Sequence, residues 1–189
     1  MSNKHMFRKT ATIAFALLLA VVFFSGCGRK VNENLVKGKA AYENKDYENA
    51  VASLLLAAQD GDAEAQYLLG RCYGDGKGVE EDEAESQKWI RKSADQGFAK
   101  SLFVMGIFED MKDNTSEAEK WFKKAIPGVR EAVEKGDSDA AFLLASAYAG
   151  GAGVEPDKEE AKKLLRKAAE MGNEDAKEFL EAIDMGGRN

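Results

Sequence analysis

A short motif recurs four times along the chain and limits the folds that it can adopt. The copies read AAQDGDAEA, SADQGFAKS, AVEKGDSDA and AAEMGNEDA, with Gly61, Gly97, Gly136 and Gly172 at their centres. Consecutive glycines are 36, 39 and 36 residues apart. Repeats of this length are typical of solenoids, in which each unit buries its apolar face by stacking on its neighbours. A glycine that ends one helix just before the next helix begins accounts for every copy.

The residues between these glycines predict two helices per unit. In the second helix, small or apolar residues follow an i, i+3, i+4, i+7 spacing, as at Ala118, Trp121, Phe122 and Ala125. This spacing gives each helix one buried stripe. The residues expected to cap helix starts are Asp62, Asp137 and Asn173, with capping boxes at Asp82/Glu85, Asn114/Glu117 and Asp157/Glu160. No segment alternates like a strand, so we expect an all-α fold of antiparallel helix pairs.

Two segments have the same arrangement of glycines followed by Val-x-x-Asp. They are LLGRCYGDGKGVEED at 68–82 and LLASAYAGGAGVEPD at 143–157. Both segments resemble the Sel-one-like repeat (SLR), a relative of the tetratricopeptide repeat, whose helices are joined by a long glycine-containing loop. The other two units are shorter between their helices and look like plain tetratricopeptide repeats. The resemblance spans residues 32–185 and implies a short right-handed solenoid.

The third unit is longer than the others around Pro127 and Gly128. The extra length is close to two helical turns, so the buried face is preserved, while Pro127 is expected to kink or break the helix. The predicted units are about 34–61, 62–97, 98–136 and 137–172, followed by a capping helix over 174–185 and a tail over 186–189.

The first residues of the chain have the features of an export signal. Lys4, Arg8 and Lys9 form a basic start, and the run from Ala11 to Phe24 is apolar. This run is shorter than the ~20 residues that span a bilayer, and it matches the apolar core of a signal peptide. We therefore predict a cleaved signal peptide over 1–26. The alternatives are an uncleaved membrane anchor or an ordinary signal peptide.

Small residues and a cysteine follow the apolar run directly. The string Phe24-Ser25-Gly26-Cys27 resembles the lipobox of bacterial lipoproteins. The resemblance implies that Cys27 becomes the lipidated first residue, joined to the repeats by a linker over 27–33. Gly28 rather than Asp follows the cysteine, which in that family favours the outer membrane, facing the periplasm, over the inner membrane. Two or three acyl chains anchor a protein stably where one does not.

The composition excludes several kinds of chemistry. The chain has a net charge of −6, and without the basic residues before Cys27 the remainder has −9. Such an acidic surface disfavours nucleic acid and suits a soluble surface or a basic partner. The only histidine is His5, and Cys72 is the one cysteine besides Cys27. Because the processed chain has no imidazole, we expect no metal site, no cofactor and no enzymatic activity, and a buried, inert thiol at Cys72.

One row of side chains is a candidate binding surface. The sixth residue after three successive glycines is aromatic, and in the resembling repeats this position and the one four residues later line a concave groove. The predicted partner-binding residues are Tyr67, Arg71, Phe103, Ile107, Phe142 and Ser146, with Lys39 and Tyr42 extending the row. Aromatic and Arg side chains are common hot spots, and such a groove takes an extended peptide or a helix. The alternative is that these aromatic rings only pack between units.

These observations predict a membrane-anchored lipoprotein that binds another protein through the concave face of its repeats. Two alternatives stay open. One is an envelope enzyme or modulator of cell-wall chemistry, and the other is a structural envelope lipoprotein without a specific partner. The sequence does not identify the partner, the biological process or the oligomeric state.

Overall fold

The computed structural model describes residues 32–186 of the chain, with side chains up to residue 182, and every regular element in that range is an α-helix. The helices are α2 (Glu33–Glu43), α3 (Tyr47–Gln59), α4 (Ala63–Asp75), α5 (Glu83–Asp95), α6 (Ala99–Asp110), α7 (Thr115–Glu134), α8 (Ser138–Gly150), α9 (Lys158–Glu170) and α10 (Glu174–Gly186). The predicted all-α fold is confirmed. The predicted signal peptide and Cys27 lie outside the described residues.

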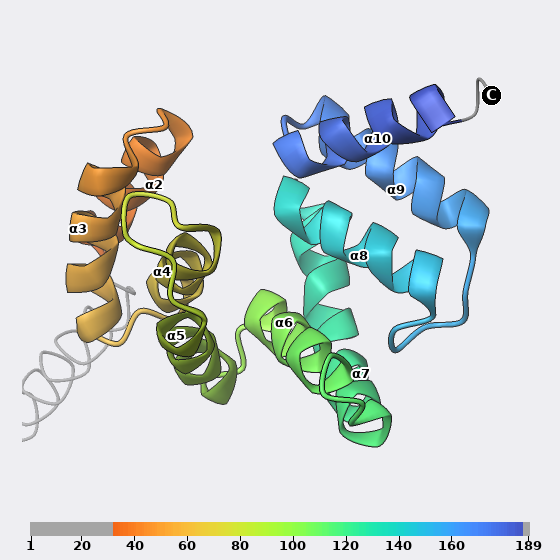
Figure 1. The fold of residues 1–189 in the computed structure, drawn as a ribbon, viewed down its shortest axis with the longest axis horizontal. Coiled ribbons are helices and arrows are strands. Elements are labelled where there is room, and N and C mark those ends of the chain that lie inside the picture. The colour runs from red at the N-terminus through yellow and green to blue at the C-terminus, as the bar shows by residue number, and fades with distance from the viewer. Residues whose placement is uncertain (1–31, 187–189) are drawn as a thin grey trace, which may run out of the picture. The chain divides into compact units, whose positions relative to one another are not determined.

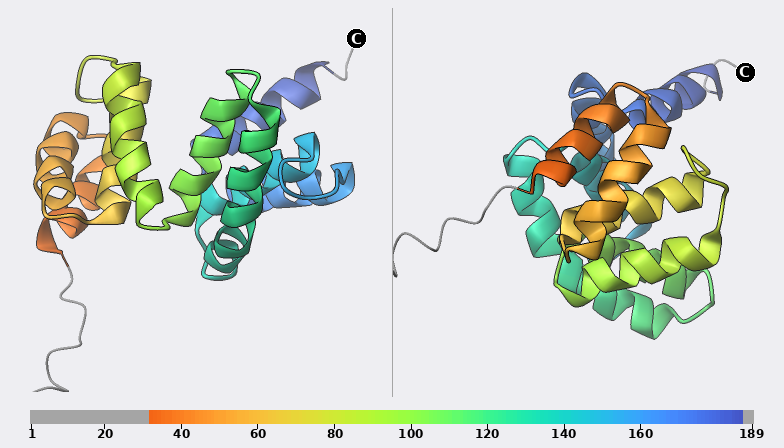
Figure 2. Two further views of the ribbon diagram at one scale, coloured as in Figure 1. Left: turned by 90° about the horizontal axis from the view of Figure 1, so that it is seen from below. Right: turned by 90° about the vertical axis from the view of Figure 1, so that its left-hand side faces the viewer.

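The helices pack as consecutive pairs. The closest packing is between α2 and α3, α4 and α5, α6 and α7, and α8 and α9, and each pair packs on the next. Figures 1 and 2 show these pairs following one another from the orange α2–α3 to the blue α9, with α10 against α9. Stacked pairs bury their apolar faces in one continuous core, as expected of a solenoid.

Glycines and caps set the sharp turns between units. The four glycines of the repeated motif all have positive φ, between +83° and +95°, the left-handed conformation that glycine adopts without a Cβ penalty. Directly afterwards, Asp62, Asp137 and Asn173 accept hydrogen bonds from backbone amides three residues later. The predicted helix ends and caps at these turns are therefore confirmed.

Two local expectations need correction. First, Pro127 does not break the helix of the third unit, because α7 continues through it as one helix of 20 residues. Its buried residues Ala118, Phe122, Ala125, Val129 and Val133 keep one face of the helix on the core.

Second, the Asn114 side chain does not cap α7. Its Nδ2 instead donates to Glu109 Oε2 at 2.9 Å, because the tight turn between α6 and α7 brings that carboxylate close. By contrast, Asp82 and Asp157 cap α5 and α9 as expected.

None of the helices within residues 32–186 is both long enough and apolar enough to cross a membrane.

Candidate interaction groove

The residues of the predicted aromatic row do not lie on one surface: some are buried in the core and others line a groove. Tyr67 on α4 and Phe103 on α6 are each 2% exposed. The Tyr67 ring packs against Phe98, with 5.5 Å between centroids, and the Phe103 ring packs against Phe122 at 4.9 Å. Burial raises the pKa of the Tyr67 phenol. These two rings contribute to packing between helices, and their assignment to partner binding stays a prediction.

The remaining members of the row take different positions. Phe142 is half-buried, and the hydroxyl of Ser146 donates to its carbonyl oxygen at 3.2 Å. Ile107 is 37% exposed. None of these three side chains lines the groove described next, whereas Lys39, Tyr42 and Arg71 all line it.

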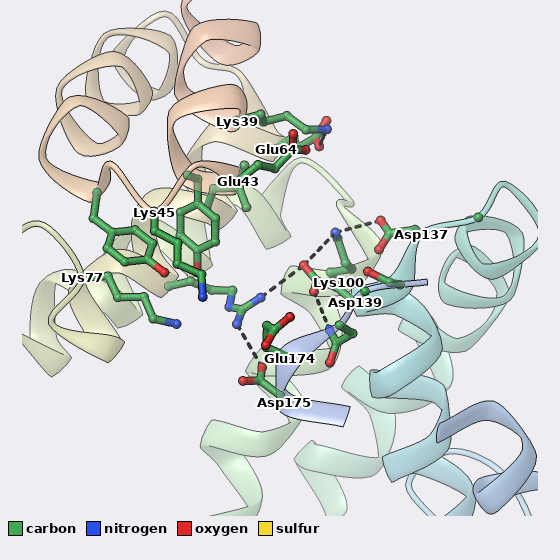
Figure 3. Close-up of a pocket in the computed structure, with 18 of the residues that line it drawn as sticks. Lys39, Glu43, Lys45, Glu64, Lys77, Lys100, Asp137, Asp139, Glu174 and Asp175 are labelled. Atoms are coloured by element: carbon green, nitrogen blue, oxygen red, sulfur yellow. Dashed lines mark hydrogen bonds and ion pairs between the residues drawn. The ribbon is translucent and has the colours of Figure 1, made fainter. Parts of the chain in front are cut away.

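The first helices of successive pairs border an open groove of about 740 Å³ (Figure 3). This volume lies within the range of ~300–1,000 Å³ that is common for ligand sites. The side chains lining the side formed by α2, α3, α4 and the adjoining turns are Lys39, Tyr42, Glu43, Lys45, Tyr47, Glu64, Leu68, Arg71 and Lys77. Those on the side of α8 and α10 are Lys135, Asp137, Ser138, Asp139, Asn173, Glu174, Asp175 and Glu178, and Lys100 of α6 lies between the two.

The two sides of the groove have opposite charge. Lysine and arginine outnumber acids on the side of α2–α4, which we call the basic wall. Aspartate and glutamate outnumber bases on the side of α8 and α10, which we call the acidic wall. In Figure 3, Lys45 and Lys77 lie on one side of the groove and Glu174 and Asp175 on the other. The groove is therefore polarised, and each wall attracts the other.

Arg71 joins the two walls. Its guanidinium lies 3.2 Å from Asp139 Oδ2 and 3.3 Å from Asp175 Oδ2, across 68 and 104 residues of sequence. Asp139 also accepts a hydrogen bond from Asn173 Nδ2 at 2.8 Å. The side chains of Arg71 and Asp139 are 21% and 28% exposed, whereas that of Asp175 is 49% exposed, so water screens the Asp175 pair more than the Asp139 pair. We call the set of Arg71, Asp139 and Asp175 the clasp.

Lys100 forms ion pairs with two carboxylates of the acidic wall, Asp137 and Asp139. Its side chain is 7% exposed, and its Nζ lies 2.8 Å from Asp137 Oδ2 and 5.0 Å from the centroid of the Tyr67 ring. Burial opposes ionisation of Asp137, but the Lys100 ammonium and the amides at the start of α8 outweigh it and lower the pKa of Asp137.

Two tyrosines, Tyr42 and Tyr47, line the basic wall of the groove. The rings of Tyr42 and Tyr47 meet edge to face, with 5.2 Å between centroids. Lys77 Nζ lies 5.9 Å and 6.0 Å from the same two centroids and 3.0 Å from Asp75 Oδ2. This corner offers partly exposed aromatic surface beside cations, a combination that is common in protein interfaces.

The acidic wall was not predicted, although the sequence contains a signal for residues that line the groove. The third residue after each motif glycine is charged: Glu64, Lys100, Asp139 and Asp175. All four line the groove, because this position lies in the first turn of every first helix. The row chosen from the sequence lies one helical turn further on, where Tyr67 and Phe103 face the core.

No cysteine or histidine is among the described side chains that line the groove. Cys72 is fully buried, as predicted, and burial raises the pKa of its thiol to about 11, which favours the protonated thiol at neutral pH. Among the side chains that the structure describes, no three His, Cys, Asp or Glu residues are grouped to hold a metal ion. What the groove presents is charge and aromatic surface.

Comparison with protein-family models gives a match to the Sel1 repeat. The matched residues are 63–98, 102–126 and 138–173, which together make up just over half of the chain. The first and last of these segments contain the two glycine loops that resemble SLR units. The second covers most of α6 and the first part of α7, in the unit that looks like a plain tetratricopeptide repeat from its sequence.

Curated proteins with similar sequences are longer than the matched region. The chain is 30% identical over 89% of its length to "DAP3-binding cell death enhancer 1" of Rattus norvegicus, and covers 38% of that protein. It is 27% identical over 72% of its length to the "Exopolysaccharide production negative regulator" of Rhizobium leguminosarum bv. viciae, and covers 55% of it. The chain thus spans roughly two fifths to just over half of these relatives.

Two solved structures are also similar. A Sel1 repeat protein from Oxalobacter formigenes is 31% identical, with a TM-score of 0.48 over 76% of this chain and 56% of that one. A protective antigen of uropathogenic Escherichia coli with an SLR fold is 29% identical, with a TM-score of 0.44 over 72% of this chain and 29% of that one.

Proposed function

Because the chain belongs to the Sel1 repeat family, whose members generally mediate protein–protein interactions, we propose that it binds a partner protein through the polarised groove. It does so as a non-catalytic module held at a membrane by acyl chains on Cys27. The observation that supports the binding site is the groove itself, in which Tyr42 and Arg71 lie among charges from α2, α4, α8 and α10.

The groove has the chemistry of a protein interface. Tyr and Arg are enriched among residues that dominate binding energies, and a concave charged surface steers partners of complementary charge. The name of the rat relative describes a protein that binds another protein. A binding role for the matched repeats here agrees with that name.

The anchor is proposed from the first 27 residues. A basic start, an apolar run too short to span a bilayer, two small residues and then Cys27 occur in the order of a lipoprotein signal. Gly28 supports a location at the outer membrane, facing the periplasm. Replacing Cys27 by Ala is expected to abolish incorporation of radiolabelled palmitate and release the protein from membranes. Unchanged labelling and retention would refute the anchor.

Site-specific photo-crosslinking in native membranes tests the groove. A photoreactive amino acid at Lys39, which lines the groove, is expected to trap one dominant protein, because the bound partner lies within reach of that side chain. The matched control is the same amino acid at Lys163, which is exposed on α9 outside the groove. Equal crosslinking from both positions, or none from Lys39, would contradict binding in the groove.

A further inference from the structure

The polarised groove points to the chemistry of its occupant. We propose that the basic wall binds an acidic segment of the partner, and that the start of α10 is a built-in competitor for it. In the unbound protein, Asp175 occupies the place on Arg71 that a carboxylate of the partner takes in the complex. This inference rests on the proposed function and adds to it the class of partner and a control of access.

The basic wall has the side chains that recognise a carboxylate. Arg71 presents a guanidinium, whose N–H groups donate charge-assisted hydrogen bonds to carboxylates; Nη1 donates to Asp139, and Nη2 donates to the exchangeable carboxylate. The aromatic corner of Tyr42, Tyr47 and Lys77 lies on the same side of the groove. Aromatic and arginine anchors are thus concentrated on the basic wall, whereas the acidic wall has no aromatic residue among its lining side chains. This difference favours an acidic occupant over a basic one.

The clasp shows that Arg71 binds a carboxylate from a distant part of the chain. Its pair with Asp175 has N–O distance 3.3 Å, and the Asp175 side chain is 49% exposed. Ion pairs this exposed contribute little to stability, because water screens them and both side chains lose freedom. A carboxylate of the partner can therefore displace Asp175 at small cost, especially when the tyrosines add apolar contact.

The second carboxylate of the clasp is held more firmly. Asp139 accepts from Arg71 and from Asn173 Nδ2, and it lies 3.8 Å from Lys100 Nζ. These partners keep Asp139 in place when Asp175 leaves. Asp175 is thus the exchangeable member of the clasp, and α10 controls how readily the groove accepts an acidic segment.

Two labelled peptides and three variants of the full chain test this inference. One fluorescein-labelled peptide consists of Glu, Gly and Tyr, and the second has Lys in place of every Glu. Binding to the detergent-purified protein is measured by fluorescence anisotropy at low salt. We expect the Glu peptide to bind in preference to the Lys peptide, Asp175→Asn to tighten its binding about threefold, and Arg71→Gln to weaken it about tenfold. Glu159→Gln removes an acid outside the groove and should leave affinity unchanged.

Tighter binding by Asp175→Asn cannot come from partial unfolding, because partial unfolding would weaken binding. Preference for the Lys peptide, binding of neither peptide, or no gain from Asp175→Asn would overturn the inference. A partner trapped from Lys39 in membranes, together with failure of the Glu peptide, would leave the proposed function standing and refute only the acidic segment. Failure of the crosslinking would refute the proposed function itself.

Discussion

At the scale of single residues, one position in the repeat serves different purposes in different units. Tyr67, Phe103 and Phe142 are equivalent in sequence, yet the first two are buried and the third is half-buried. Four residues later, Arg71 reaches across the groove, whereas Ser146 bonds to its own helix. Spacing predicts which helical turn a residue occupies, but burial depends on how the neighbouring pair packs against that turn.

The burial of Tyr67 gives a stability prediction. Tyr67→Ala should lower the free energy of unfolding by roughly 3–5 kcal/mol, because it leaves a cavity between α4 and the start of α6. Urea denaturation of the purified protein measures this change. Ile107→Ala is the control from the same row, and we expect a smaller loss because Ile107 is 37% exposed. An unchanged midpoint for Tyr67→Ala would instead support a role in binding alone.

At the scale of elements, the two long loops pack on the second helix of the preceding pair. A Cβ on Gly153 would lie 2.8 Å from the backbone carbon of Phe122 and 2.9 Å from the Lys123 nitrogen on α7, and φ there is +69°. The Gly153 amide also donates to Glu119 Oε2 at 3.3 Å. The glycine therefore serves contact between units as well as the turn itself.

Gly153→Ala is expected to destabilise the protein by about 1–3 kcal/mol, because the helix backbone cannot move aside for the methyl group and the positive φ disfavours alanine. Gly150→Ala is the matched control three residues earlier, where an added Cβ meets nothing within 4 Å. It should be neutral or slightly stabilising, since alanine favours a helix. Thermal melts of both variants measure the difference, and equal melting temperatures would show that the loop does not pack as described.

At the scale of the repeat domain, the clasp connects helices that are not packing neighbours. α4 packs on α3 and α5, and α10 packs on α9, while Arg71 joins α4 to α8 and α10. In a solenoid each unit contacts only its neighbours, so curvature accumulates through many small interfaces. A link across the concave face restrains that curvature directly.

Arg71→Gln should therefore widen the distribution of distances across the groove. Spin labels on cysteines introduced at Glu43 and Glu178, one on each wall, report this distance by double electron–electron resonance. High salt should broaden the wild-type distribution in the same direction by screening the clasp. Lys88→Gln, which breaks an ion pair with Glu85 outside the groove, is the control. Identical distributions for Arg71→Gln and wild type would refute the restraint.

The helix pairs follow from the sequence alone, because the spacing of the motif glycines and the capping aspartates are local signals that act within one turn of the chain. The sequence also indicated that α7 keeps one buried face through Pro127. Which side chains border the groove depends instead on how the units stack. The Arg71 pairs join residues 68 and 104 positions apart, and such a meeting depends on the summed rotation of every unit between them. A local sequence pattern does not specify this summed rotation. The clasp and the opposite charges of the two walls therefore could not be predicted from the sequence.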